Sequence, residues 1–451
     1  MPKKNIKKIN HNIDQAMISF FAKELGVGNL RPNDSLLDFG EDKLSFLVDK
    51  INKNLSINLT LSDIKSNPRI VSAVELIKNL YFQKRAARTQ RITPGAKSKY
   101  YPLSYAQKRL WFLYKFEPDS PLYNIYFAQE ITGRLNIEIL KKAIESLIER
   151  HDIFRFNFLE KNGEPVQTIA DKINIDSVFR FADLTGINND AERKKQEDNI
   201  IKEQLSAPFR LDKDPALRIM VIKRGEFKKN QFVFITIIHH IIFDRWSVGI
   251  FNRELSDIYN FLSGKRASNP PSPSLQYEDY AQWEQSLDND HVFKKQEKYW
   301  LNVLKGELPV LNLPTDKHRP LVQSYHGSME YIFLDGEDIE GLRDFSRRTN
   351  TTVFTILLSV FYIFLHRVTG QTDIIIGTPT ANRKISEVAD VMGLFLNSLS
   401  LRSDLSDDPK FTVLLERIKN TVIGALDNQE VPFEYLLEKL RPERDAGRSP
   451  I

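Results

Sequence analysis

Apolar residues recur at helical spacing over the first part of the chain. Three stripes stand out, at residues 13–25, at about residues 44–55 and at residues 70–80. The pair Asn67-Pro68 separates the last two stripes, as expected where one helix ends and another begins. The pattern predicts a small helical bundle over residues 13–81, a size at which a bundle folds alone only marginally.

From Pro102 onward the pattern mixes helical and strand periods. Residues 231–238 form a run of β-branched and aromatic residues, which is typical of a strand buried on both faces. A Pro-rich stretch at 269–273 interrupts the chain between two α/β portions, which predicts two subdomains with a cleft between them. The other elements expected here are helices at 137–150, 247–262, 336–349 and 352–367, and a strand at 373–377.

These patterns predict four parts of the chain. They are a helical bundle at 1–82, a linker at 83–101, and two subdomains at 102–268 and 269–451. A chain of 451 residues is long enough for about three domains, which fits this division. The linker is basic and contains no acidic residue, and we interpret it as solvated. A nucleic-acid partner is disfavoured, because no nucleic-acid-binding motif accompanies the basic stretch.

Composition excludes whole classes of mechanism. The chain has no cysteine, so it has no thiolate nucleophile, disulfide, Cys-ligated zinc or iron–sulfur cluster. A hydrophobic fraction of 41% fits a folded chain rather than a disordered one. No apolar run reaches the length of about 20 residues that crosses a membrane, and no export signal is evident. We therefore expect a cytoplasmic protein without a membrane partner.

The candidate chemistry follows the predicted strand at 231–238, where His239, His240 and Asp244 lie within six residues. The end of a strand presents side chains to a cleft on a fixed backbone. A histidine there could act as a general base or orient an amine, because its pKa suits neutral pH. The same residues could instead simply pack in the core. A metal site is disfavoured, because no third ligand accompanies the pair.

Residues 239–247 resemble the HHxxxDG signature of the condensation domains of nonribosomal peptide synthetases. Six further segments resemble other motifs of that family, in the family's order. They are residues 104–113 (SYAQKRLWFL), 150–155 (RHDIFR), 277–283 (YEDYAQW), 376–383 (IGTPTANR), 393–399 (GLFLNSL) and 429–434 (QEVPFE). The amino-acid sequences of the first two motifs resemble those of the subtype that joins an L-configured donor to an L-configured acceptor.

The resemblance implies an α/β (α+β) fold, in which two chloramphenicol-acetyltransferase-like subdomains form a V-shaped pseudo-dimer with the histidine motif in a tunnel between them. Donor and acceptor peptidyl carrier proteins would deliver thioesters on phosphopantetheine arms, and the acceptor amine would attack the donor thioester to form a peptide bond. Neighbouring synthetase domains, such as an adenylation domain, would be further partners in antibiotic or siderophore biosynthesis. The chain itself would bind no cofactor covalently.

The resemblance also implies roles for individual residues. His240 would orient or deprotonate the acceptor amine, beside His239 and Asp244. Asp244 would pair with Arg155 to hold the loop, and Asn382 would support the site. The residues expected to contact the substrate are Trp246, Ser247 and Gly249.

One residue departs from the signature, because Arg245 stands where the family has glycine. Glycine permits backbone conformations and close approaches that a residue with a Cβ does not. The arginine could point away from the tunnel, gate it against an arm, bind the phosphate of an arm or impair catalysis. We expect that Arg245 narrows the acceptor side of the tunnel.

Residues 34–44 resemble a carrier protein around its phosphopantetheine attachment site. The attachment serine falls on Lys43, or on Glu41 if the register shifts by two, and neither side chain can form the phosphodiester. Ser45 is the remaining candidate in this segment. We expect either a degenerate carrier that serves as a docking or spacing element, or a carrier whose serine was replaced. Members of the family also continue past the motif at 429–434 for several dozen residues, so the second subdomain is expected to be truncated.

Three functions stay open on these grounds. The first is a condensation domain that forms peptide bonds, which the intact His239, His240 and Asp244 favour. The second is a catalytically silent relative that recruits another enzyme or docks subunits, which Arg245, the missing serine and the truncated end favour. The third is a coenzyme-A-dependent acyltransferase of the same superfamily, and the carrier-like unit and the full motif set count against it.

Overall fold

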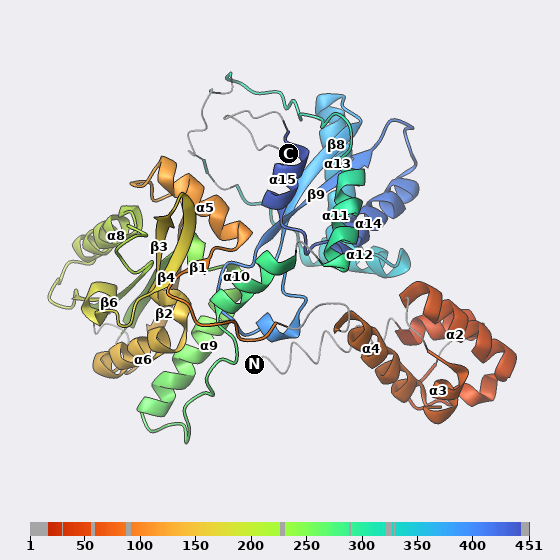
Figure 1. Cartoon of the computed structure of the whole chain (residues 1–451), viewed down its shortest axis with the longest axis horizontal. Helices are drawn as coiled ribbons and strands as arrows, with labels where there is room; N and C mark the ends of the chain where they lie inside the picture. Colours follow the sequence, from red (N-terminus) through yellow and green to blue (C-terminus); the bar gives the residue numbers. More distant parts are fainter. Residues whose placement is uncertain are drawn as a thin grey trace. The chain divides into compact units, whose positions relative to one another are not determined.

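The computed structural model describes residues 17–28, 30–55, 59–86, 92–225, 231–287, 290–318, 320, 327–328, 330–442 and 451. The chain divides into two compact units, Met1–Arg91 and Ile92–Ile451. Figure 1 shows both units, and each is described by itself.

The first unit is a bundle of short helices. Residues 17–25 are helical, and they are followed by η1 (Leu36–Phe39), α2 (Glu41–Leu55), α3 (Leu61–Ser66) and α4 (Ile70–Ala86). The apolar stripes of these helices meet in one core, in which Phe21, Leu47 and Ile77 are fully buried. The predicted bundle is therefore confirmed, although α4 runs beyond the boundary predicted at residue 82.

The first half of the second unit contains two sheets. A four-stranded sheet has the order β2-β7-β6-β5, in which only β5 and β6 are parallel, and a three-stranded sheet has the order β1-β4-β3. The strands are β1 (Tyr101–Pro102), β2 (Asn124–Thr132), β3 (Phe156–Lys161), β4 (Glu164–Ile169), β5 (Phe179–Asp183), β6 (Leu217–Gly225) and β7 (Gln231–His239). The helices are α5 (Tyr105–Phe116), α6 (Ile137–Arg150), η2 (Asp152–Arg155), α7 (Ile175–Val178), α8 (Asp190–Ser206), η3 (His240–Ile242), α9 (Arg245–Leu262) and α10 (Tyr277–Ser286).

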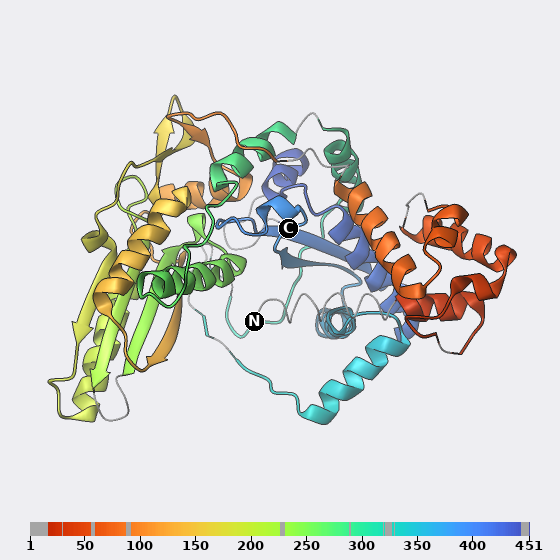
Figure 2. The same ribbon diagram turned by 90° about the horizontal axis from the view of Figure 1, so that it is seen from below.

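Helices cover both faces of the four-stranded sheet, as Figure 2 shows. On one face, Phe251 of α9 packs edge-on against Phe127 of β2, with ring centroids 5.7 Å apart. On the other face, Glu197 of α8 pairs with Arg224 of β6. Central strand β7 is buried from Phe232 to His239. This double coverage explains why its sequence is a continuous apolar run rather than an alternating one.

The second half is built around an antiparallel pair of strands, β8 (Asp373–Thr380) and β9 (Asn397–Asp404). Its helices are α11 (His291–Val303), α12 (Gly336–Arg348), α13 (Val353–Thr369), η5 (Ser386–Val388), α14 (Phe411–Asp427) and α15 (Phe433–Leu440). Trp300, Tyr362 and Ile418 are the fully buried centre of a second core. The helices and strands expected from the sequence in both halves are confirmed, with ends that differ by a few residues.

The two cores are interleaved along the chain, and this differs from the predicted subdomain boundary at 268/269. Residues 385–396 lie between β8 and β9 in sequence, yet Val388, Met392 and Phe395 pack into the first core. Helix α10 also contributes to that core. Ile92 is buried there as well, and the backbone N–H of Gly95 donates to Asp279 at 2.7 Å. The last part of the predicted linker is therefore attached to the second unit at Ile92, at the backbone of Gly95 and at Tyr101, while residues 93–99 are exposed to solvent.

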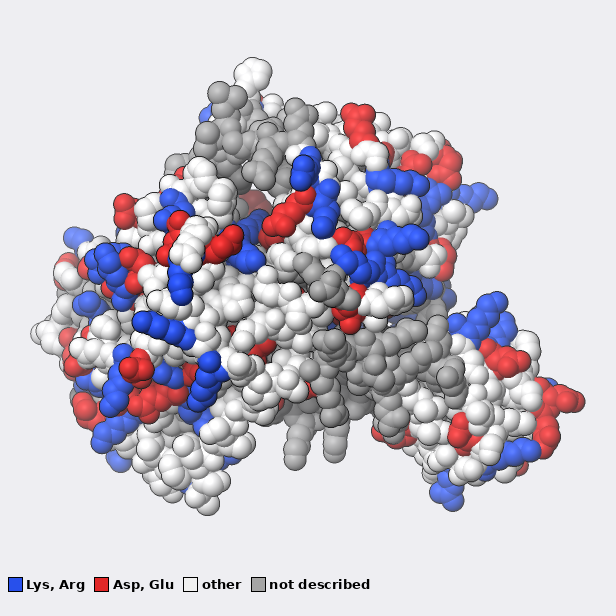
Figure 3. Space-filling model, viewed as in Figure 1, with Lys and Arg blue, Asp and Glu red and all other residues white. Residues whose placement is uncertain are grey.

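Helix α13 leaves an apolar stripe on the surface. Six of its side chains are about half exposed, namely Phe354, Leu357, Val360, Phe361, Phe364 and Val368. In the part of the chain that the structure describes, no single helix is long and apolar enough to cross a membrane. Helices α12 and α13 meet that test only as a pair, and they are bent by 100° at their junction. On the face drawn in Figure 3, acidic and basic side chains are interspersed.

Candidate active site

The histidine pair lies where β7 ends and the chain turns toward α9. The N–H of His239 donates to Ala216 O at 3.0 Å, and the N–H of His240 donates to Tyr123 O at 2.8 Å. These two bonds attach the histidines to the residues immediately before β6 and β2, the strands on either side of β7. The backbone of the pair is therefore fixed by the sheet, and the next residues form the short helix η3.

His239 is a buried, neutral side chain. It is 4% exposed and packs between the rings of Tyr123 and Phe209. Burial, helped by the neighbouring His240, lowers the pKa of His239 to about 3. Its Nδ1 accepts the N–H of Ile241 at 3.2 Å, which places the ring proton on Nε2. His239 therefore shapes the turn and is not suited to take up a proton near neutral pH.

His240 is the histidine that reaches the surface. Its side chain is partly exposed. Its Nδ1 is buried, and no hydrogen-bond partner for it is found among the described residues. Because Nδ1 is buried, a ligand would meet the exposed part of the ring instead. Of the two histidines, His240 is thus the one placed to bind or deprotonate an amine.

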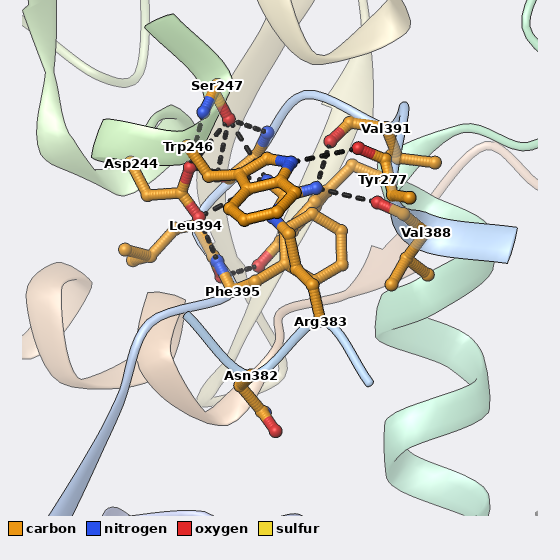
Figure 4. Close-up of polar contacts among 12 residues, drawn as sticks. Asp244, Trp246, Ser247, Tyr277, Asn382, Arg383, Val388, Val391, Leu394 and Phe395 are labelled. Atoms are coloured by element: carbon orange, nitrogen blue, oxygen red, sulfur yellow. Dashed lines mark hydrogen bonds and ion pairs between the residues drawn. The ribbon is translucent and has the colours of Figure 1, made fainter. Parts of the chain in front are cut away.

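Asp244 fixes the loop between the histidines and α9. It is the N-cap of α9, and its Oδ1 accepts from the backbone N–H and the hydroxyl of Ser247, both at 2.8 Å. Its Oδ2 accepts from the N–H of Phe395 at 3.2 Å. Figure 4 shows the carboxylate surrounded by these donors and by Arg383, whose Nη2 lies 3.2 Å from Oδ2.

The predicted pairing of Asp244 with Arg155 is wrong. Arg155 instead pairs with Asp152 and donates to the carbonyl of Ala170 at 2.9 Å. The reason is directional, because η2 aims Arg155 at the end of β4, whereas the start of α9 faces the segment that follows β8. Asp244 and Arg383 are 2% and 1% exposed as side chains, so theirs is a buried ion pair.

Arg383 is the functional residue that sequence reasoning missed. Its guanidinium donates to the carbonyls of Val388 and Val391, both at 2.6 Å, and lies 3.9 Å from the ring centre of Phe395. Burial lowers the pKa of Arg383, and the charge of Asp244 opposes that effect. The available signal was its place at the end of the quoted motif at 376–383, directly after the predicted Asn382.

Asn382 does not contact the aspartate. It has a left-handed backbone with φ of 50°, and its side chain points away from Asp244 in Figure 4. Its backbone N–H reaches Thr380 Oγ1 at 3.5 Å. The left-handed turn at Asn382 changes the chain direction just before Arg383, a conformation that asparagine tolerates better than most residues. Asn382 therefore acts on the loop through its backbone rather than its side chain.

The residues predicted to contact substrate differ in exposure. Trp246 is 51% exposed, and its indole N–H donates to Ala389 O at 3.0 Å. Ser247 is fully buried, and its hydroxyl also accepts the N–H of Gly393 at 3.0 Å. Gly249 is exposed two residues further along α9. Ser247 therefore holds residues 385–396, which cross from the second half into the first core and are called the crossing segment below. Trp246 and Gly249 remain accessible.

Arg245 is accommodated without backbone strain. It is the first residue of α9 and is not among the described non-glycine residues with positive φ. Its side chain is exposed. The glycine that the signature carries at this position is therefore not required by the backbone here, and Arg245 presents a cation to solvent beside the loop.

A buried polar network supports the loop from behind, and the sequence did not single it out. The side-chain amide of Gln107 donates to Ile241 O at 3.2 Å. The hydroxyl of Tyr277 lies 2.8 Å from Ser104 Oγ and donates to Leu394 O at 2.5 Å. Helices α5 and α10 are thus joined both to η3 and to the crossing segment. Among the described residues, no group of three or more His, Asp or Glu side chains could hold a metal ion.

Comparison with known proteins gives the class of this fold and site. The Condensation domain family matches residues 97–451, so the chain belongs to that family. The chain is 33% identical to tyrocidine synthase 3 of Brevibacillus parabrevis over 445 residues, which make up 98% of this chain and 6% of that synthase. It is 32% identical to gramicidin S synthase 2 of Brevibacillus brevis over 444 residues, which make up 98% of this chain and 9% of that synthase. The chain thus spans less than a tenth of either relative.

Solved structures agree on the fold. The X-domain from teicoplanin biosynthesis superposes with a TM-score of 0.70 at 24% identity, covering 80% of this chain and 78% of that one. The first condensation domain of the calcium-dependent antibiotic synthetase superposes with a TM-score of 0.60 at 19% identity, covering 76% and 79%. The expected mixed α/β fold of condensation domains is confirmed.

Proposed function

We propose that the second unit joins two carrier-bound substrates by forming an amide bond. The observation that carries the proposal is His240, which is partly exposed directly after β7, whereas its neighbour His239 is buried. The acceptor's α-amine would attack the carbonyl carbon of the donor thioester. The C–S bond would break, the thiol would leave on the donor's arm, and the amine would lose one proton.

The residues around His240 would hold the reacting groups in place rather than transfer protons. A thioester is already activated, so holding the amine and the thioester together would supply much of the rate. His240 would orient the amine or accept its proton, two roles that histidine side chains commonly take in catalysis. His239 stays neutral and shapes the turn, and the Asp244–Arg383 pair fixes the loop. Arg245 would narrow the entry on the acceptor side.

A condensation assay with two loaded carriers tests the proposal. We expect the intact chain to form dipeptide product, and His240→Ala to lose most of this activity because the positioning group is gone. His291→Ala is a matched control, because His291 is an exposed histidine at the start of α11. A His240→Ala variant as active as the intact chain would contradict the role of His240. Absence of product with the intact chain would favour a recruiting role instead.

We also propose that the first unit is a carrier-like domain without an arm. Its support is the match to tyrocidine synthase 3 over 98% of this chain, which extends beyond the matched residues 97–451 into the first unit. Lys43 is exposed on the first turn of α2, where the attachment serine is expected, and Ser45 is exposed two residues on. After treatment with a phosphopantetheinyl transferase and coenzyme A, we expect no mass gain on this chain. A gain of one arm would contradict the proposal.

The finer expectations from the sequence belong to the same proposal. The arms would come from separate donor and acceptor carriers, and an adenylation domain would be a neighbour. The selectivity for an L-configured donor and an L-configured acceptor can be tested by loading the donor carrier with either enantiomer, and a preference for the D-donor would contradict it. The cytoplasmic location stays a prediction.

A further inference from the structure

A small basic pocket in the first half of the second unit lies outside the candidate active site. Its volume is about 200 Å³. The walls come from the end of η2, the start of β3, the segment after β4, helix α7 and the segment before β6. The residues that matter for its charge are Arg155, Lys172 and Lys213, and no acidic residue lines the pocket.

Arg155 is built into the wall of this pocket. Its guanidinium pairs with Asp152 and donates to the carbonyls of Ala170 at 2.9 Å and Asp171 at 3.3 Å, so its position is fixed. The side chain is only 16% exposed. Its Nε is buried, and no partner for it is found among the described residues. A buried donor without a partner is rare and indicates a missing ligand or water.

The two lysines add charge at the rim. Lys172 and Lys213 are both at least partly exposed. Lys213 Nζ lies 3.7 Å from an oxygen of Asp212, and exposed pairs of this kind are weak. The pocket therefore combines one fixed guanidinium with two flexible ammonium groups, an arrangement that suits a compact anion with several oxygen atoms.

We propose that this pocket binds a phosphate group. Because Asp152 already compensates the charge of Arg155, the two lysines supply the charge that would attract an anion, and two ammonium groups match a phosphate dianion better than the single charge of a carboxylate. The volume admits a phosphate with the first atoms of an ester. The pocket also adjoins the candidate active site, because Pro215 lines it and the next residue, Ala216, accepts the N–H of His239. The phosphate would come either from free inorganic phosphate or from a phosphopantetheine arm. The site itself does not depend on the proposed condensation activity, and only the second source rests on it.

Equilibrium dialysis of the full chain with radiolabelled inorganic phosphate, at low ionic strength and neutral pH, tests the proposal. We expect saturable binding at one site. Each lysine supplies a charge-assisted hydrogen bond, so Lys172→Ala and Lys213→Ala should each weaken binding by about tenfold. Neither lysine is buried, so these variants should fold. Lys195→Ala, at an exposed lysine of α8 outside the pocket, is the matched control and should bind phosphate as the intact chain does.

Competition with coenzyme A distinguishes the two sources. If coenzyme A displaces phosphate from the intact chain, the site takes the phosphate of an arm; if it does not, the site takes free phosphate. Non-saturable binding would overturn the proposal. Binding that survives in the Lys172→Ala/Lys213→Ala variant, or that falls equally in Lys195→Ala, would overturn it as well. The His240→Ala assay is independent of these outcomes.

Discussion

The buried pair of Asp244 and Arg383 permits a sharp test of how the histidine loop is held. Removing one partner of a buried ion pair leaves the other charge without compensation, which costs about 3–5 kcal/mol. Arg383 also donates to the carbonyls of Val388 and Val391. We therefore expect Arg383→Met to lower the free energy of unfolding by about 4 kcal/mol. Asp244→Asn keeps a side-chain oxygen for the N-cap, so about 3 kcal/mol is expected.

The double variant separates the pair from its surroundings. Since each single variant leaves one unpaired group, Asp244→Asn/Arg383→Met should cost less than the two single changes together, by about 2 kcal/mol. Asp244→Asn combined with Arg155→Met is the matched control. These two residues do not contact each other, so their effects should add within about 0.5 kcal/mol.

Urea unfolding followed by tryptophan fluorescence measures these energies in the full chain. All 4 tryptophans lie beyond residue 91, so the signal reports on the second unit alone. The reasoning is refuted if Asp244 and Arg383 show no coupling, or if Asp244 couples to Arg155 instead.

Three further predictions concern other parts of the second unit. Burial raises the pKa of Glu284 to about 7 from an ordinary 4.5, so the folded protein holds a proton that the unfolded chain releases, and stability falls as pH rises between these values. In urea unfolding at pH 4.5 and pH 7, Glu284→Gln should reduce this loss of unfolding free energy by about 3 kcal/mol. A pH dependence equal to that of the intact chain would contradict the raised pKa of Glu284. A Cβ on Gly393 would meet the ring of Tyr277, so Gly393→Ala should lower the free energy of unfolding by about 1–3 kcal/mol. A Cβ on Gly249 would meet open space, so Gly249→Ala should not destabilise the protein in the same assay. Leu357→Glu on the exposed stripe of α13 should change stability by at most about 0.5 kcal/mol while reducing binding of a hydrophobic dye, and undiminished dye binding would count against an accessible stripe.

Local patterns in the sequence predicted most of the elements but not their long-range partners. The run at 231–238 predicted β7 and hence the place of His240, because a strand buried on both faces has an unmistakable composition. The partner of Asp244 could not be predicted in this way. Arg155 and Arg383 are each the last residue of a recognisable motif. Only the direction in which η2 and the turn at Asn382 aim the two side chains decides which of them reaches Asp244. The packing of Val388 and Phe395 into the first core was equally invisible, since apolar residues in a loop do not show which core they join.

The interleaved cores have a consequence for how this protein is made and engineered. The first core lacks Val388, Met392 and Phe395 until the ribosome has synthesised about a hundred residues beyond α10. The first half therefore cannot finish folding before much of the second half has emerged, and its assembly depends on contacts of high sequence separation, which form slowly. A fusion or exchange joint placed between the two halves would divide one core between two parents. Joints that keep residues 92–396 from a single parent would leave that core whole.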